Sequence, residues 1–258
     1  MVPDSTSDIR IVLVEPSHPG NIGAVARAMK NMDLTQLVLV RPEQFPHAEA
    51  TARAAGAESV LLAAHVVGSL AEALEGCGFV AATTARDRDQ YFRVQDVRAV
   101  AARVIAESRR APVALLFGTE RTGLRNEDLE ASHVLLRIPA SREYASLNLA
   151  MAVQLVSYEI FRARAAAADG LPATRVAAAP LATPQQMQQL YGHLEEVLRD
   201  VDFKDRTRSG TQLMSRIRRF LQRAELDLNE VHILRGIFTA IQGRRRRAGS
   251  GQQPKART

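Results

Sequence analysis

Five short apolar runs constrain the fold of this chain more than any other feature of its sequence. Each run is five or six residues long and rich in branched side chains, and they lie at residues 9–14, 36–40, 79–83, 113–117 and 134–138. Continuous apolar strands are typical of parallel sheets that helices cover on both faces. The runs therefore predict the strands of a parallel sheet.

Segments with helical spacing separate these runs and follow the last of them. They lie at residues 22–32, 69–76, 97–108 and 148–167, and the second opens with a candidate capping box, Ser69 and Glu72. Consecutive parallel strands need a crossover connection, usually a helix. The alternation predicts an α/β domain over residues 1–164, and the length of 258 residues leaves room for a smaller second domain.

The pattern changes after residue 164. Residues 165–182 are rich in Ala and Pro and have no periodicity, which indicates a linker. Residues 183–242 then contain three helical patterns, each with a cap signal: Thr183 with Gln186, Ser209 with Gln212, and Asp227 with Glu230. In the middle pattern the candidates for a buried stripe are Leu213, Ile217, Phe220 and Leu221. We expect a small helical domain here.

The basic residues are concentrated in the last third of the chain. Residues 181–258 contain 15 Lys and Arg against eight Asp and Glu, a net charge of +7, whereas residues 1–180 carry −1. A basic extension on a neutral body indicates a polyanionic partner, most often a nucleic acid, and Arg216 and Arg219 are candidate contacts. The alternative is that the excess of basic residues belongs to a solvated tail without a partner, because residues 243–258 have the composition of a disordered basic tail.

Cysteine content and apolar segments give the expected compartment. Cys77 is the single cysteine, which excludes a disulfide framework within the chain. The sequence has neither a secretory signal pattern nor an apolar stretch long enough to span a bilayer. We therefore expect a soluble, cytoplasmic protein.

Three loops that follow predicted strands contain the residues able to bind or react. The first, EPSHPGNIG at residues 15–23, leads into a helix that carries Arg27, so that backbone N–H groups point towards a ligand. The second is FGTERTGL at 117–124, and the third is IPASREYASLNLA at 138–150. Parallel sheets bind ligands at the carboxyl ends of their strands. Taken singly, however, each loop has an ordinary structural explanation. The first is more often a turn with a helix cap than a site, the glycines of the second fit a turn that needs positive φ, and Ser146 and Asn148 of the third can cap the helix that follows.

Several common catalytic motifs are absent. The chain lacks the glycine fingerprint of dinucleotide-binding domains, the P-loop, the G-x-S-x-G elbow, H-E-x-x-H and C-x-x-C, and its six His have no metal-ligand spacing. Dehydrogenase, nucleotide triphosphatase, serine hydrolase and zinc-enzyme functions are therefore disfavoured.

In their order, the three loops resemble the motifs of the SPOUT class of RNA methyltransferases, in its ribose 2′-O branch. HPGNIGAVARAMKNM resembles the first motif, FGTERTGL the second and IPASREYASLNLAMAVQ the third. The form YASLNLAMAVQ and the C-terminal helical segment are most similar to members that methylate the cytidine or uridine at position 32 of the tRNA anticodon loop. The resemblance extends from Arg10 to about Gln242.

This resemblance implies properties that periodicity cannot reveal. The fold would be a SPOUT-type parallel sheet with a C-terminal deep trefoil knot, followed by a small all-helical domain that binds tRNA. The cofactor would be S-adenosyl-L-methionine, held in the knot, and the protein would act as a homodimer without metal or membrane.

Site residues follow from the same resemblance by motif position. Those implied to bind the cofactor are Thr83, Thr84, Ala85, Gly118, Glu120, Ile138, Ser146 and Leu147, with main-chain groups dominating adenine recognition. Arg27, Ser146 and Asn148 match the catalytic positions. Arg86 and Arg88 match a basic pair at the substrate entrance.

The implied reaction is attack of a ribose 2′-oxygen on a sulfonium methyl group, with a neutral thioether leaving and no metal required. The protein then has to align the reactants, exclude water and manage one hydroxyl proton. Because arginine stays protonated, we expect Arg27 to contact the adjacent phosphate and the developing alkoxide rather than to act as a base. Ser146 and Asn148 would hold the ribose or the methionine part of the cofactor.

A second class of function stays open on the sequence alone. A catalytically silent RNA-binding protein could keep the same fold, and cofactor binding separates the two hypotheses.

Overall fold

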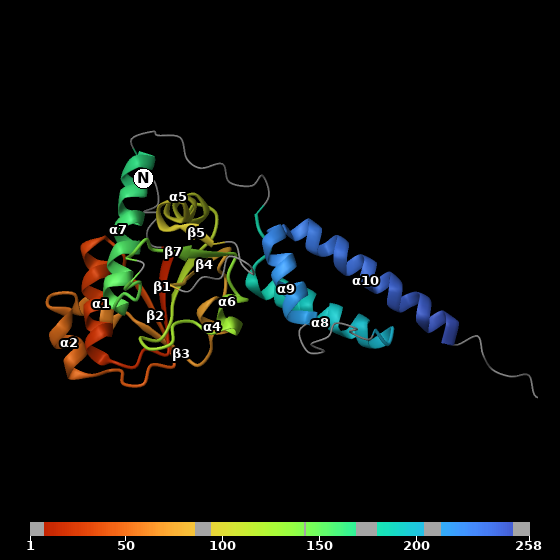
Figure 1. Ribbon diagram of the computed structural model, residues 1–258, viewed down its shortest axis with the longest axis horizontal. Coiled ribbons are helices and arrows are strands. Elements are labelled where there is room, and N and C mark those ends of the chain that lie inside the picture. Colours follow the sequence, from red (N-terminus) through yellow and green to blue (C-terminus); the bar gives the residue numbers. More distant parts are fainter. Residues whose placement is uncertain (1–7, 86–93, 142, 169–179, 204–212, 250–258) are drawn as a thin grey trace, which may run out of the picture.

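A parallel sheet forms the centre of the structure, a computed structural model that describes residues 8–85, 94–141, 143–168, 180–203 and 213–249. Within these ranges the sheet has seven strands in the order β3-β2-β1-β6-β4-β7-β5 (Figure 1). All five predicted runs are strands: β1 (Ile9–Val14), β2 (Gln36–Val40), β4 (Phe79–Thr83), β6 (Val113–Phe117) and β7 (Val134–Arg137). The sequence missed β3 (His65–Val67) and β5 (Val94–Asp96), because three residues are too few to form an apolar run.

Helices cover both faces of the sheet, as the apolar strands predict. Alternate residues of β1 enter different cores, with Ile11 and Leu13 on one face and Val12 on the other. The first face packs against α1 (Pro19–Asn31), α5 (Val97–Ser108) and α7 (Leu149–Ala168). The second face contacts α4 (Leu70–Ala73) and α6 (Asn126–Leu129). The Ser69 hydroxyl caps α4 by accepting the Glu72 N–H, as predicted, whereas the Glu72 carboxylate accepts from the Gly68 N–H and the Ser69 hydroxyl in place of the reciprocal bond of a capping box.

Helix α1 packs closely on the short helix α2 (Ala48–Ala54), which leads into α3 (Glu58–Leu62). A Cβ atom on Gly23 would lie 2.0 Å from the Ala50 carbonyl oxygen, so only glycine permits this approach. We expect Gly23→Ala to lower the free energy of unfolding by about 1–3 kcal/mol through overpacking, measured by urea denaturation. Gly236→Ala is the matched control, because a Cβ there meets nothing within 4 Å. Equal stability of the two variants would contradict the proposed close packing.

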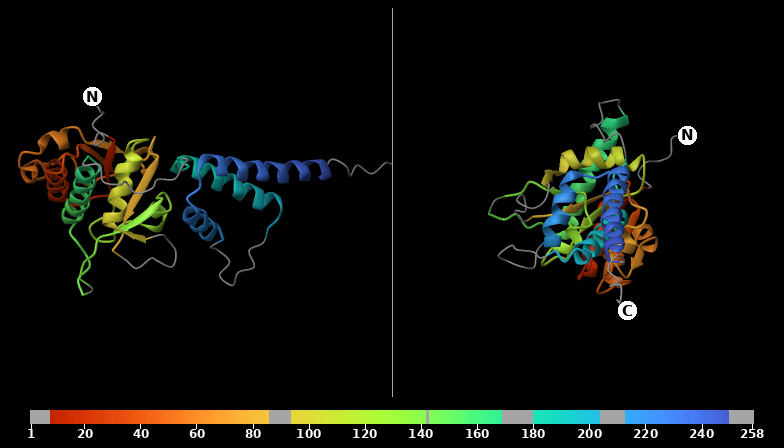
Figure 2. Two further views of the ribbon diagram at one scale, coloured as in Figure 1. Left: turned by 90° about the horizontal axis from the view of Figure 1, so that it is seen from above. Right: turned by 90° about the vertical axis from the view of Figure 1, so that its right-hand side faces the viewer.

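Three C-terminal helices surround a separate core to one side of the sheet (Figure 2). They are α8 (Pro184–Asp200), α9 (Leu213–Ala224) and α10 (Leu228–Gly249), and Leu190, Leu221 and Val231 pack between them. The predicted capping boxes at Thr183 and Asp227 are present. The predicted cap at Ser209 lies outside the described residues.

Two predicted boundaries differ from the structure. Helix α7 continues to Ala168, so residues 165–168 of the predicted linker are helical, and residues 169–179 are not described. Helix α10 continues to Gly249, so the prediction that disorder begins at Gly243 is wrong for residues 243–249. Arginine is a good helix former, and extending an existing helix requires no new nucleation. Among the helices of the described ranges, none is long and apolar enough to cross a bilayer.

His133 joins the C-terminal helices to the sheet. Its Nδ1 accepts the Val80 N–H at 2.9 Å, so the ring proton lies on Nε2 and is donated to the Ala182 carbonyl oxygen at 3.1 Å. Burial lowers the pKa of His133, which keeps the ring neutral and this arrangement intact.

Candidate active site

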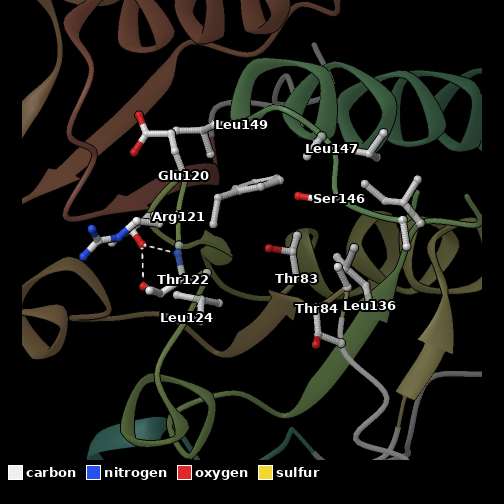
Figure 3. A pocket seen from close by; sticks show the side chains of 18 of the residues that line it. Thr83, Thr84, Glu120, Arg121, Thr122, Leu124, Leu136, Ser146, Leu147 and Leu149 are labelled. Atoms are coloured by element: carbon white, nitrogen blue, oxygen red, sulfur yellow. Dashed lines mark hydrogen bonds between the residues drawn. The ribbon is translucent and has the colours of Figure 1, made fainter. Parts of the chain in front are cut away.

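A cavity of about 380 Å³ lies at the carboxyl edge of the sheet. Its walls are the segments that follow β4, β6 and β7 together with the first turn of α7 (Figure 3). Parallel strands end at the same edge, which brings the second and third sequence motifs together although the sequence separates them.

The structure places every residue implied to bind the cofactor around this one cavity. These residues are Thr83, Thr84, Ala85, Gly118, Glu120, Ile138, Ser146 and Leu147. The side chains of Thr83 and Ser146 approach the space from different segments (Figure 3). The Thr83 hydroxyl donates to the Leu116 carbonyl oxygen at 2.9 Å, which leaves its lone pairs available to a ligand.

Apolar side chains complete the lining, and most of them could not be predicted from the sequence. Leu124, Leu129, Leu136 and Leu149 contribute to the wall. An apolar residue at the end of a strand or in the first turn of a helix looks like ordinary core, so no sequence signal marked them. Together with the hydroxyl groups they form a cavity suited to a ligand with both a flat apolar ring and polar groups.

The second motif folds back on itself at the cavity wall. A Cβ atom on Gly118 would lie 2.2 Å from both the carbonyl carbon of Gly123 and the backbone nitrogen of Leu124. Gly123 has a φ of +67°, and its N–H donates to the Thr119 carbonyl oxygen at 2.9 Å. Both glycines of the motif therefore have a structural reason, one steric and the other conformational.

Glu120 connects the second motif to the first. One carboxylate oxygen accepts from the Ser17 N–H at 3.0 Å and the Ser17 hydroxyl at 2.9 Å. The other accepts from the His18 N–H at 3.2 Å and Asn21 Nδ2 at 3.0 Å. The third motif joins this network through Asn148, whose Nδ2 donates to Asn21 Oδ1 at 3.1 Å. One hydrogen-bond network thus links all three motifs.

The environment of Glu120 lowers its pKa below the usual value of 4.5. Burial alone would raise it, but the hydrogen bonds from Asn21 and Ser17 stabilise the ionised form and outweigh burial. A group with a lowered pKa stabilises the folded chain above its unfolded pKa, and this contribution is lost as the pH falls through the lowered value.

We therefore expect Glu120→Gln to lower the free energy of unfolding by about 1–3 kcal/mol at pH 7, because its amide cannot accept from all these donors. The difference from the unaltered protein should shrink as the pH falls below 4.5. Denaturation at several pH values measures it, with the exposed Glu127→Gln as control. A difference that stays constant down to pH 3 would contradict this account.

The residues matched to catalytic positions lie in different places. Ser146 lines the cavity, and Asn148 lies beside it in the Glu120 network. Arg27 is exposed on α1 and is absent from the cavity lining of the described chain. The positions of Ser17 and Asn21 were not predicted, because their contacts with Glu120 span about a hundred residues of sequence.

The residues predicted to contact RNA are only partly described. Arg86 and Arg88 lie outside the described residues. Arg216 is exposed on α9, and Arg219 is half-buried on the same helix.

Comparison with known families separates the chain into the same two parts. Residues 8–158 match the SpoU rRNA methylase family, and residues 185–253 match the C-terminal domain of the tRNA methyltransferase TrmJ.

Similar proteins cover nearly the whole chain. The tRNA (cytidine/uridine/adenosine-2′-O-)-methyltransferase TrmJ of Pseudomonas aeruginosa (strain UCBPP-PA14) is 46% identical over 242 residues, which cover 91% of this chain and 93% of the relative. The tRNA (cytidine/uridine-2′-O-)-methyltransferase TrmJ of Escherichia coli (strain K12) is 44% identical over 235 residues, covering 91% and 95%. The crystal structure of TrmJ from Z. mobilis ZM4 has a TM-score of 0.76 and 31% identity, covering 90% of this chain and 98% of that one.

These matches confirm the resemblance to SPOUT ribose methyltransferases. The chain belongs to the SpoU rRNA methylase family and, within it, to the TrmJ group.

Proposed function

We propose that this protein transfers the methyl group of S-adenosyl-L-methionine to a ribose 2′-oxygen of tRNA, at the cytidine or uridine in position 32 of the anticodon loop. The observation that carries the proposal is the convergence of the three motifs on one cavity through the Glu120 network. The names of the TrmJ relatives support tRNA as the substrate.

The cavity residues fit this cofactor by their chemistry. Leu136, Ile138 and Leu147 supply apolar surface for an adenine ring, and the hydroxyls of Thr83 and Ser146 can bond to polar groups. The Glu120 carboxylate adds a negative charge at the wall, which favours a positively charged ligand. We infer that these residues hold the cofactor, with main-chain groups recognising adenine.

When bound, the cofactor would supply an electrophilic sulfonium methyl group: as the ribose 2′-oxygen bonds to the methyl carbon, the bond to sulfur breaks, a neutral thioether leaves and the hydroxyl proton passes to solvent. Ser146 and Asn148 position the reactants by hydrogen bonds at the cavity mouth. Arg27 stabilises the negative charge that develops on the oxygen and holds the neighbouring phosphate with its forked donors.

The deep trefoil knot implied by the family belongs to this proposal. We infer that the chain between β7 and α7 passes through the loop formed by the segment that follows β6. The two parts of the chain then have different roles. The knotted part, up to Ala168, binds the cofactor, and residues 183–242 form a helical domain that holds the tRNA with Arg216 and Arg219, assisted at the entrance by Arg86 and Arg88. A cytoplasmic location stays a prediction from the sequence.

A second copy of the chain completes the site in this proposal. Helix α7 exposes an apolar stripe at helical spacing, with Met151 56%, Leu155 40% and Tyr158 45% exposed. Arg27 is exposed and does not line the cavity of its own chain, so we infer that it serves the cavity of a partner that packs on this stripe.

Leu155→Arg tests the dimer. A charge in the apolar stripe should convert the dimer to a monomer and remove methyl transfer, because Arg27 then reaches no cavity. Analytical ultracentrifugation and a methylation assay measure the two effects. Leu62→Arg is the control, since Leu62 is 88% exposed on α3 and should leave the dimer intact. A dimeric, active Leu155→Arg variant would contradict the proposal.

Methyl transfer from labelled cofactor to an unmodified tRNA transcript, followed by nucleoside analysis, tests the function. The expected product is 2′-O-methylcytidine or 2′-O-methyluridine. Tight RNA binding without cofactor binding would instead favour the alternative of a catalytically silent RNA-binding protein.

A further inference from the structure

Helix α9 has an inner face that packs against the rest of the protein. Met214, Ile217 and Leu221 belong to the core shared with α8 and α10. One helical step further round, Arg218 and Gln222 point to α6. These residues fall on one side of the helix at spacings of three and four residues.

Hydrogen bonds connect α9 to Glu130, the residue that follows α6, close to the cavity wall. Arg218 donates to Glu130 and to Glu195 of α8, each at 3.0 Å. Gln222 Nε2 donates to the carbonyl oxygen of Glu130, just after the last residue of α6. The neighbouring residue Leu129 lines the cavity. These hydrogen bonds therefore join α9 to the segment that borders the cavity.

The opposite face of α9 presents an aromatic ring between two arginines. Arg216, Phe220 and Arg223 follow one another at spacings of four and three residues, so they lie in one row on the helix surface. All three are exposed, and Phe220 has 60% of its surface accessible. The expectation that Phe220 joins the buried stripe is thus wrong, because Met214 and Leu221 fill the core instead.

The charge of α9 indicates the chemistry of what covers this row. The helix contains four arginines and no acidic residue. An exposed Phe between guanidinium groups provides a flat surface for a base and two cations for the flanking phosphates. Stacking needs a base that is free of a duplex, as in a tRNA loop.

We propose that Arg216, Phe220 and Arg223 form a binding site for unpaired nucleotides of the RNA substrate, with a base stacked on Phe220. The site rests on the proposed tRNA substrate and adds a recognition element to it. Because Arg218 and Gln222 anchor the same helix to α6, the site holds one loop of the RNA at a set distance from the cavity. A second copy is a poorer occupant, since a symmetric contact would bring like charges together.

The absence of tryptophan from the chain provides a direct test. Phe220→Trp introduces a single indole, whose fluorescence should be quenched on titration with unmodified tRNA, because a base stacks on it. Leu62→Trp is the matched control. Leu62 is 88% exposed on α3, and the fluorescence of an indole there should change little on titration.

Affinities separate stacking from charge. Phe220→Leu keeps an apolar side chain but should weaken tRNA binding about 5- to 150-fold, the loss of one stacked base. The slope of log K against log salt should not change, whereas Arg216→Ala should reduce it by about 0.7 for a single-stranded phosphate contact. Phe220→Tyr should restore the affinity.

The following results would each exclude the proposed nucleotide-binding site. Unchanged affinity in Phe220→Leu, or equal quenching at positions 220 and 62, would exclude stacking on Phe220. Quenching that depends on protein concentration without RNA, with a larger assembly in sedimentation, would show that a second copy covers the face. Failure of the unaltered protein to bind any tRNA would count against the proposed function itself, which is how the two failures differ.

Discussion

Alanine in place of Arg27 is expected to reduce methyl transfer at least about 100- to 1,000-fold while cofactor affinity stays unchanged. The loss corresponds to one preorganised donor that acts on the charge of the transition state. Cofactor affinity should persist because Arg27 is exposed on α1 and does not line the cavity of its own chain. Single-turnover methylation of a tRNA transcript and calorimetric titration with cofactor measure the two quantities.

Two further variants sharpen this experiment. Arg27→Lys keeps the charge but loses the forked geometry, so it should recover only part of the activity. Arg53→Ala removes another exposed arginine, from the neighbouring helix α2, and should leave turnover unchanged. Undiminished turnover in Arg27→Ala would exclude the assigned role.

Gly118→Ala is expected to show the opposite behaviour, with cofactor affinity reduced about 5- to 150-fold. The new Cβ would lie 2.2 Å from backbone atoms of Gly123 and Leu124, so the loop that forms the cavity wall must shift. Displacing the backbone by overpacking costs about 1–3 kcal/mol, and we expect the free energy of cofactor binding to become less favourable by this amount. Calorimetric titration with S-adenosyl-L-methionine measures the change.

The matched control is Gly192→Ala on α8. A Cβ at Gly192 meets nothing within 4 Å, so this variant should bind cofactor normally and be stabilised by about 0.5–1 kcal/mol. If Gly118→Ala binds as tightly as the control, the cavity described here is not the cofactor site. Together, the Arg27 and Gly118 variants separate the transfer step from cofactor binding.

Much of the fold could be predicted from local pattern. The runs at 9–14 and 113–117 are strands because branched apolar residues with no polar alternation suit a sheet buried on both faces. The side-chain caps at Ser69, Thr183 and Asp227 formed because their partners are only three residues away. Short elements and the ends of helices were predicted less well, since α10 continues beyond Gly243.

The candidate site could be predicted in part, and for a different reason. Its motifs were identified by family resemblance, and their convergence follows from the common edge at which parallel strands end. The roles of Ser17 and Asn21 could not be predicted, since Ser and Asn near the start of a helix are also ordinary cap residues. Only the folded chain shows that both donate to Glu120.

The sequence by itself determined the parallel α/β body, the helical C-terminal part and the family, because these depend on periodicity, cap signals and motif order along the chain. The tertiary structure alone decided which groups meet across long separations, such as Asn148 with Asn21, and which side of α9 faces outward. The physical reason is that helical periodicity places Phe220 and Leu221 about 100° apart around the helix but does not say which of them faces the core. Packing of α9 against both α6 and the helical core then buries Leu221 and leaves Phe220 exposed.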